Sequence, residues 1–290
     1  MTTSKTLTSR YQENRWQAHL FKAYLLISIT AGFVLLGALI TKVLIDGSGV
    51  LTWDFLTSLP STLAERAGAR VAILATIYLG LLLLAFAVPI GVATALYLEE
   101  YANRKRFYNL WLEINIQNLA GVPSIVYGIL GLAFLVRGLS LGRVLLAGAL
   151  ILTLLVLPTV IVASREAIRA VPSSIRHGAL ALGATHWQMV SRQVIPAAIP
   201  GIATGMILSL ARAIGETAPL LLVGALSFVT VNPSILGDFT ALPVQIFQWI
   251  SRPQDEFRAK AAAAIIVLLI ILLLMNSFAV WIRNRYERKW

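Results

Sequence analysis

Apolar residues fall into six long runs along the chain, and shorter polar stretches separate one run from the next. A transmembrane helix needs about 20 mainly apolar residues, and each run is about that long. The pattern therefore predicts an all-α polytopic membrane protein with six transmembrane helices. The runs are 20–45, 71–98, 115–136, 143–163, 201–227 and 261–282.

Polar segments complete the predicted organisation. Residues 1–19 form a polar N-terminal tail, and the run that follows is too long for the roughly 7–15-residue core of a signal peptide. Residues 46–70 are too long for a turn, and because they contain Trp53 and Phe55 we expect them to lie at the membrane interface. The other polar segments are a loop at 164–200, a loop at 228–260 and a C-terminal tail at 284–290.

Composition agrees with a membrane protein and limits its chemistry. Hydrophobic residues make up 58% of the 290 and charged residues 13%, whereas soluble domains carry about 25% charged residues. The chain has no cysteine, which excludes disulfides, thiolate catalysis and cysteine metal sites. We find no catalytic triad, no convergent pair of carboxylates and no Gly-Lys-Ser/Thr phosphate loop. We therefore expect a protein that is not an enzyme and holds no metal or cofactor of its own.

The net charge of +11 is explained by membrane orientation. Six spans place both termini on one side, and 15 of the 24 Lys and Arg residues lie on that side, against 8 on the opposite side. Positive residues accumulate in cytoplasmic loops, so we expect both termini in the cytoplasm. This alternation accounts for the basic charge without a nucleic-acid partner. The one remaining positive residue is Arg212, which lies within an apolar run.

Arg212 and Glu216 form the first candidate site, since charge inside a membrane span is expensive and usually functional. On a helix, residues four apart face the same way. Arg212 lies about ten residues into its run, or roughly 15 Å at 1.5 Å per residue, near the middle of the membrane. A guanidinium suits phosphate oxygens. Pro219 leaves a backbone carbonyl near Gly215 without its donor, so we expect the helix to be locally open there. The alternative is a structural ion pair that locks two helices.

Other polar residues near apolar runs are weaker candidates. Ser124, Tyr127 and Thr217 are positioned to line a pathway, although small residues also serve close helix packing. Arg165 and Arg169, at the membrane edge of the 164–200 loop, are placed either to attract an anion or to anchor the loop at the cytoplasmic face.

The 164–200 loop predicts two short helices. Ser173, after Pro172, is a suitable helix cap, and Gly183 is a natural stop. A second helix is expected over about 186–194, ended by Pro196. Such a pair forms either a compact knob that stands off the membrane or an amphipathic connector on the lipid surface.

The pattern of Ala179, Gly183 and Ile195-Pro196, with thirteen residues from Gly to Pro, resembles the coupling motif of ABC importer permeases. The resemblance implies a type I ABC importer permease fold over 71–283. It also implies that the loop docks on a partner ATPase, which binds ATP and magnesium. The usual Glu of the motif falls on His177 here, so a contact made by that Glu elsewhere does not carry over. The implied ATPase-coupling residues are His177, Ala179, Gly183, Trp187, Ile195 and Pro196.

Further segments narrow the resemblance. Those at 97–102, 118–128 and 212–219 are similar to permeases of phosphate importers, and those at 240–247 and 251–258 resemble the A-type subunit. The resemblance implies a C-type permease partner, two ATPase subunits and an extracytoplasmic phosphate-binding protein, all acting at the lipid membrane. The alternatives are a C-type subunit, a permease for another oxyanion, an ion-coupled secondary transporter that uses Arg212 and Glu216 as a proton relay, and a membrane-bound enzyme.

Overall fold

The structure of the protein, a computed structural model, describes residues 5–103, 105–225 and 229–286. Nearly all of these residues are helical, and β-pairing in the described part is confined to an isolated bridge between Val144 and Asp238. Five helices are long and apolar enough to cross a membrane, and a bent pair of helices makes a sixth span. The long helices are α1 (Lys5–Ser48), α3 (Arg70–Leu96), α6 (Leu145–Arg169), α9 (Ile195–Gly215) and α12 (Asp255–Tyr286).

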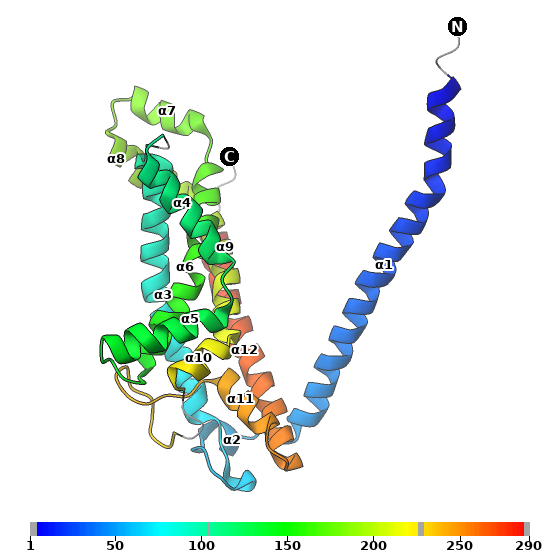
Figure 1. The fold of residues 1–290 in the computed structure, drawn as a ribbon, viewed down its shortest axis with the longest axis vertical. Helices are drawn as coiled ribbons and strands as arrows, with labels where there is room; N and C mark the ends of the chain where they lie inside the picture. The colour runs from blue at the N-terminus through cyan, green and yellow to red at the C-terminus, as the bar shows by residue number, and fades with distance from the viewer. Residues whose placement is uncertain (1–4, 104, 226–228, 287–290) are drawn as a thin grey trace.

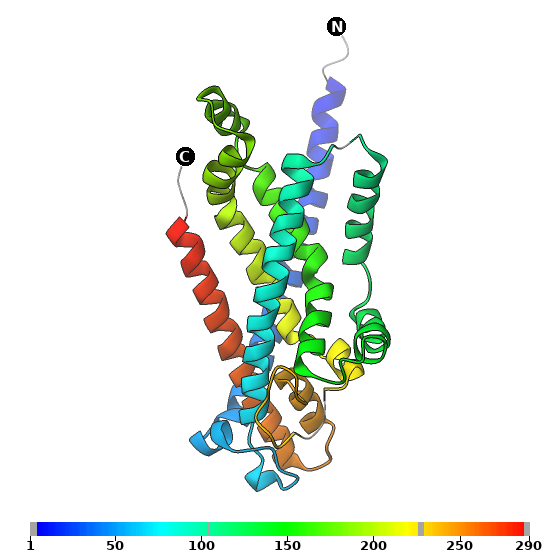
Figure 2. The same ribbon diagram turned by 90° about the vertical axis from the view of Figure 1, so that its left-hand side faces the viewer.

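Shorter elements connect the spans or extend them. The short α-helices are α2 (Trp53–Thr57), α4 (Phe107–Ala120), α5 (Ser124–Gly131), α7 (Ser173–Ala181), α8 (His186–Met189), α10 (Ala218–Val223) and α11 (Leu242–Ile250). The π-helical turns are η2 (Tyr97–Tyr101), η3 (Leu132–Gly138) and η4 (Val190–Val194), and η1 (Ala64–Arg66) is a 3₁₀ turn. The first turn of α1 and the last turn of α12 lie at the end of the molecule that carries α7 and α8, hereafter the α7 end, whereas α2 and α11 lie at the opposite end (Figures 1 and 2).

Four long helices form the bundle. α3 packs on α6, α6 on α9, and α9 on α12. Lipid offers no hydrophobic driving force between helices, so close packing through small residues replaces it. The α6–α9 crossing follows this rule, since Gly201 lies against Ala167 and Gly205 against Ala163.

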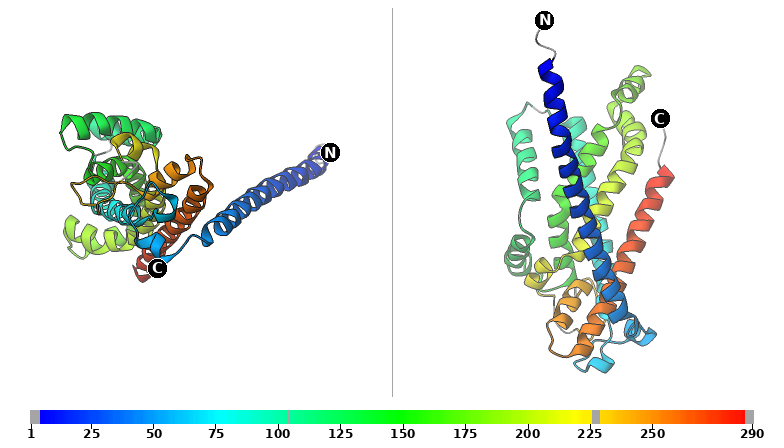
Figure 3. Two further views of the ribbon diagram at one scale, coloured as in Figure 1. Left: turned by 90° about the horizontal axis from the view of Figure 1, so that it is seen from below. Right: turned by 90° about the vertical axis from the view of Figure 1, so that its right-hand side faces the viewer.

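Helix α1 leaves the bundle at a wide angle and contacts α12 only near its own C-terminal end (Figures 1 and 3). The contact is tight, because Gly47 lies directly on the backbone at Ala262. The other described side chains of α1 are almost all exposed. The helix begins at Lys5, so the predicted tail at 1–19 is mostly a helical extension of the span predicted at 20–45. Residues 1–4 and 287–290, in the two predicted tails, lie outside the described residues.

The span predicted at 115–136 is wrong as a single straight helix. α4 ends at Ala120, α5 begins at Ser124, and the two helices meet at an angle of 106°. Pro123 causes the break, because proline has no N–H to donate and disfavours helical backbone in the residue before it. The hydroxyl of Tyr127 donates to the carbonyl of Leu119 at 2.9 Å and so closes the bend from its inner side.

The predicted interfacial segment 46–70 is only partly at the surface. Trp53 is 77% exposed, as expected of an interfacial residue, but Phe55 is buried. The Phe55 ring lies 5.9 Å from the ring of Trp249 in α11, and the ammonium of Lys260 lies over it. Alternate positions on the short helix α2 point to opposite sides, and the sequence alone could not show which side meets the bundle.

Candidate functional site

The span predicted at 201–227 breaks where its charges lie. α9 ends at Gly215, Glu216 adopts an extended conformation (φ −75°, ψ 124°), and α10 begins at Ala218. Pro219 stands in the first turn of α10, where a missing N–H costs nothing. Proline therefore restarts the helix after the break, and the predicted local opening of the helix is confirmed. The end of the predicted span, 226–227, lies outside the described residues.

The guanidinium of Arg212 is only loosely held by Glu216. The Nε of Arg212 lies 3.7 Å from Oε1 of Glu216, beyond hydrogen-bond distance. The side chain of Arg212 is 56% exposed and that of Glu216 is 21% exposed. Both residues belong to one continuous segment, the last turn of α9 and the residue after it. The pair therefore does not lock two helices together, and the arginine is open to another anion.

Helix α5 carries Ser124 and Tyr127 and packs on α10 beside this break, in which Thr217 itself lies. Gly128 of α5 faces Pro219 of α10 so closely that a Cβ would stand 2.8 Å from the Pro219 Cα. Ser124 and Thr217 are half-buried, whereas Tyr127 is buried. The hydroxyl of Tyr127 is engaged at the α4–α5 bend. The role of these three residues in a pathway stays a prediction, but their segments meet.

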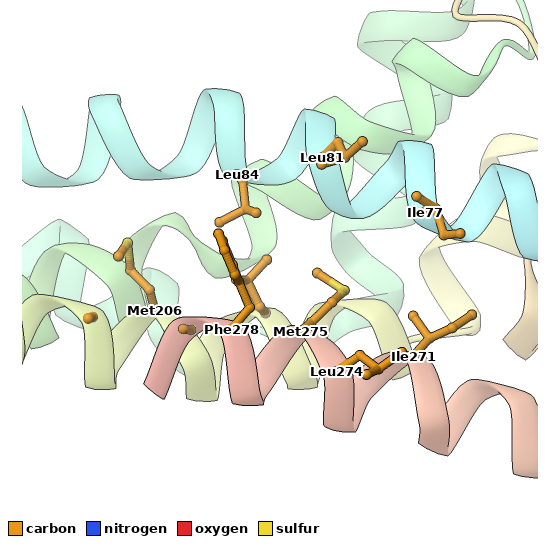
Figure 4. Close-up of a pocket in the computed structure, with 11 residues that line it drawn as sticks. Ile77, Leu81, Leu84, Met206, Ile271, Leu274, Met275 and Phe278 are labelled. Carbon is orange, nitrogen blue, oxygen red and sulfur yellow. The ribbon is translucent and has the colours of Figure 1, made fainter. Parts of the chain in front are cut away.

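A large cavity lies elsewhere and has a different chemistry. It has a volume of about 460 Å³ and lies between α3, α9 and α12. Its walls are apolar side chains, among them Leu81, Met206, Met275 and Phe278 (Figure 4). An anion loses its hydration in such a cavity without gaining a partner. The cavity is therefore unsuited to a charged substrate.

The first of the two short helices predicted in the 164–200 loop is confirmed as α7. Gly183 adopts a left-handed conformation (φ 83°), which glycine takes without strain. Its N–H donates to the Leu180 carbonyl at 3.0 Å, and the Ala184 N–H donates to the Ala179 carbonyl at 3.2 Å. These two bonds form a Schellman motif, so Ala179 and Gly183 together end α7.

The predicted N-terminal cap of the first loop helix is wrong. Ser173 already lies inside α7, and Pro172 before it provides no side-chain cap. The side-chain cap belongs to α8, where Thr185 and Gln188 form a reciprocal capping box.

Pro196 does not end the second helix, which runs without interruption from His186 to Gly215 over 30 residues. The π-helical turn η4 precedes the proline, and its wider hydrogen-bonding pattern accommodates a residue that cannot donate. One helix therefore joins the loop to Arg212.

The loop exposes apolar side chains at the α7 end. Leu182 is 90% exposed and Trp187 60% exposed. His177 is also exposed, whereas Ala179, Ile195 and Pro196 are half-buried. α7 and α8 stand at the tip of the molecule (Figure 1), and their exposed face is suited to contact a partner.

Sequence reasoning missed an ion-pair cluster at the α7 end. The buried guanidinium of Arg165 donates to Glu99 at 2.8 Å and to Glu113 at 2.7 Å, and Arg169 donates to Glu99 at 2.8 Å. These bonds join η2, α4 and α6. Anion attraction by Arg165 and Arg169 is therefore not supported, because carboxylates of the chain already hold both guanidiniums. The signal in the sequence was the adjacent pair of carboxylates, Glu99 and Glu100, directly after the apolar run 71–98.

Chemistry of other kinds is not indicated in the described part of the chain. Among the described residues, no group of three or more His, Asp or Glu side chains could hold a metal ion. The fold and the site thus define a polytopic membrane protein with an exposed arginine at a helix break and an exposed helical loop at one end.

Residues 87–288 match the family of binding-protein-dependent transport system inner membrane components, and the chain belongs to this family. The expected ABC importer permease fold is confirmed, and the chain is a multi-pass membrane subunit that is not itself an enzyme.

Named relatives and a solved structure agree with this family. The chain is 32% identical to the probable ABC transporter permease protein YqgI of Bacillus subtilis, over 74% of this chain and 73% of that protein. It is 37% identical to the phosphate transport system permease protein PstA 1 of Mycobacterium tuberculosis, over 58% of this chain and 55% of that protein. A chain of a bacterial ABC transporter involved in the import of alginate superposes with a TM-score of 0.64 at 18% identity, over 96% of this chain and all of that chain. That likeness shows the fold alone.

Proposed function

We propose that the chain is the A-type permease subunit of an ATP-driven importer of inorganic phosphate. The observation that carries this proposal is the 37% identity, over 169 residues, to a permease named for phosphate transport. The aligned part is 55% of that protein. The geometry at Arg212 agrees with an anionic substrate, because the guanidinium is exposed and lies beyond hydrogen-bond distance of Glu216, so that its donors can bind an anion.

Arg212 is the residue that contacts phosphate in this proposal. Its planar fork of donors matches phosphate oxygens, and its side chain is exposed in the last turn of α9, directly before the break. Glu216 neutralises Arg212 when the site is empty, and it accepts a hydrogen bond from a protonated phosphate oxygen when the site is filled. Ser124, Tyr127 and Thr217 line the pathway on the side of α5 and α10.

The 173–196 loop docks on the ATPase. His177 and Trp187 lie on its exposed face, whereas Ala179 and Gly183 shape the end of α7. Ile195 and Pro196 begin α9, the helix that carries Arg212. A force on the loop therefore reaches the arginine through continuous helix, and ATP-driven closure of the ATPases switches the pore between inward-open and outward-open states.

The complete importer contains a C-type permease partner, two ATPase subunits that bind ATP and magnesium, and an extracytoplasmic phosphate-binding protein. Both termini and the α7 end face the cytoplasm. The positive charge on that side supports this orientation, and the shared position of the first turn of α1, the last turn of α12 and α7 agrees with an even number of crossings.

Uptake of labelled phosphate by the reconstituted complex tests the proposal. Competition by sulfate, molybdate and phosphonate separates phosphate import from import of another oxyanion. An ion-coupled secondary transporter would take up substrate without an ATPase, and the family to which the chain belongs does not favour it. Co-purification of an ATPase subunit decides between these two classes.

A further inference from the structure

Arg176, the fourth residue of α7, connects three separate elements. Its guanidinium donates to Oε1 of Glu100 from Nε at 3.0 Å and from Nη2 at 2.8 Å. Nη2 also donates to the carbonyl of Ile168 at 2.8 Å, and Nη1 donates to the carbonyl of Val171. The carboxylate is in η2, at the end of α3. The Ile168 carbonyl is in the last turn of α6, and the Val171 carbonyl is in the connection just after it.

The contact is well protected from water. The side chain of Glu100 is 6% exposed and that of Arg176 is 20% exposed. An arginine at this place is doubly favoured, because it donates to backbone carbonyls at and just beyond the end of α6 and neutralises the negative end of the α6 dipole. The other contacts that hold α7 in place are apolar, since Ile175 and Ala179 pack on the cluster that contains Met189 and Val194. Arg176 therefore supplies the polar, directional contact of α7.

The neighbouring residue Glu99 extends this connection. It binds Arg165 and Arg169 of α6, and Arg165 in turn binds Glu113 of α4. Adjacent carboxylates in the π-helical turn η2 thus fasten α6 and α4 on one side and α7 on the other. α4 leads through the 106° bend to α5, which packs on α10 beside the break after Gly215. The loop is therefore connected to the region of the break in two ways. One is the continuous helix from His186, and the other is the set of ion pairs made by Glu99 and Glu100.

We propose that Arg176 is the positioning residue that couples α7 to the transmembrane helices, and that it acts through Glu100. This inference rests on the proposed function, in that α7 receives the movement of the ATPase. When the pair is broken, α7 still docks on the ATPase but shifts relative to α3 and α6. Fewer substrate molecules are then transported for each ATP hydrolysed.

The test measures the phosphate transported per ATP hydrolysed, in proteoliposomes that contain the whole importer and its binding protein. Glu100→Gln removes the charge but leaves the bonds from Arg176 to the carbonyls in place. Arg176→Gln removes both, and Arg176→Lys retains the charge. The matched control is Arg258→Gln, which breaks the exposed pair of Arg258 with Asp255.

We expect the ratio to fall between about twofold and about thirtyfold in Glu100→Gln and Arg176→Gln, the range for substitutions that alter coupling between sites. Arg176→Lys should recover part of the loss and Arg258→Gln should match the wild type. The double variant should be no worse than the worse single variant, because the two residues act as one unit.

An unchanged ratio in Glu100→Gln would overturn the proposal, and so would additive losses in the double variant. Loss of assembly in Glu100→Gln, with an intact control complex, would assign the pair to folding alone and would also overturn it. If the wild-type complex moves a different anion, the proposed function fails, but the ratio is then measured with that anion and the role of Arg176 is still decided.

Discussion

Replacing Arg212 by glutamine should abolish transport and leave the stability of the protein almost unchanged. The ion pair with Glu216 spans 3.7 Å, and the arginine side chain is 56% exposed. Solvent-accessible pairs of this kind contribute about 0–1 kcal/mol. Glutamine retains the polarity of the side chain without its charge, so the free energy of unfolding should change by less than about 1 kcal/mol. The loss of function then follows from the missing charge and not from misfolding.

Arg165→Gln is the matched control, because it makes the same substitution in the opposite environment. Arg165 is 6% exposed and binds Glu99 and Glu113. Breaking a buried pair costs about 3–5 kcal/mol, and we expect about 3 kcal/mol here because Arg169 still holds Glu99.

Thermal unfolding of the purified protein in detergent and phosphate uptake by the reconstituted complex measure the two effects. The melting temperature should fall by roughly 6–12 °C for Arg165→Gln and by no more than about 4 °C for Arg212→Gln. Wild-type uptake by Arg212→Gln would refute the assignment of the substrate site. An equal fall in melting temperature for the two variants would refute the view that Arg212 is loosely paired.

Two further predictions concern packing at the site and docking of the loop. Gly128→Ala places a Cβ 2.8 Å from the Pro219 Cα, so we expect a loss of about 1–3 kcal/mol in unfolding free energy and slower uptake. The control is Gly178→Ala, whose new Cβ meets no atom within 4 Å, and its free energy of unfolding should rise by about 0.5–1 kcal/mol. Similar unfolding free energies for the two variants would contradict the close packing of Gly128 on Pro219. A cysteine at His177, in a chain that has none of its own, should crosslink to the ATPase, and a cysteine at Thr57 near the opposite end should not. Failure of the His177 variant to crosslink would reject the docking face.

The sequence predicts the number and positions of the spans better than their shapes. Hydropathy shows how long a segment stays apolar but does not show whether its helix bends. For this reason the segment 115–136 was expected to be a single helix. Pro123 was the available signal for the bend. Pro196 was expected to end a helix but does not, because the adjoining π-helical turn accommodates a residue that has no N–H to donate. Whether a proline breaks a helix or is accommodated depends on neighbouring packing that the sequence does not display.

Local signals also explain which parts of the site were predictable. Arg212 and Glu216 stand out as charges in an apolar run, and Gly183 as a glycine at a helix end. The cluster around Arg165 was not predictable, since its partners Glu99 and Glu113 are 66 and 52 residues away along the chain. Such pairs depend on how α3, α4 and α6 approach one another, and charge counting had assigned the same arginines to orientation or anion attraction.

Uptake of labelled phosphate by proteoliposomes that contain both permease subunits, the ATPases and the binding protein tests the central claim most directly. We predict uptake that requires ATP on the side of the α7 end, and that unlabelled phosphate suppresses while sulfate, molybdate and phosphonate at equal concentration do not. Uptake that a proton gradient drives without ATP, or that sulfate or molybdate suppresses as strongly as phosphate does, would contradict the claim.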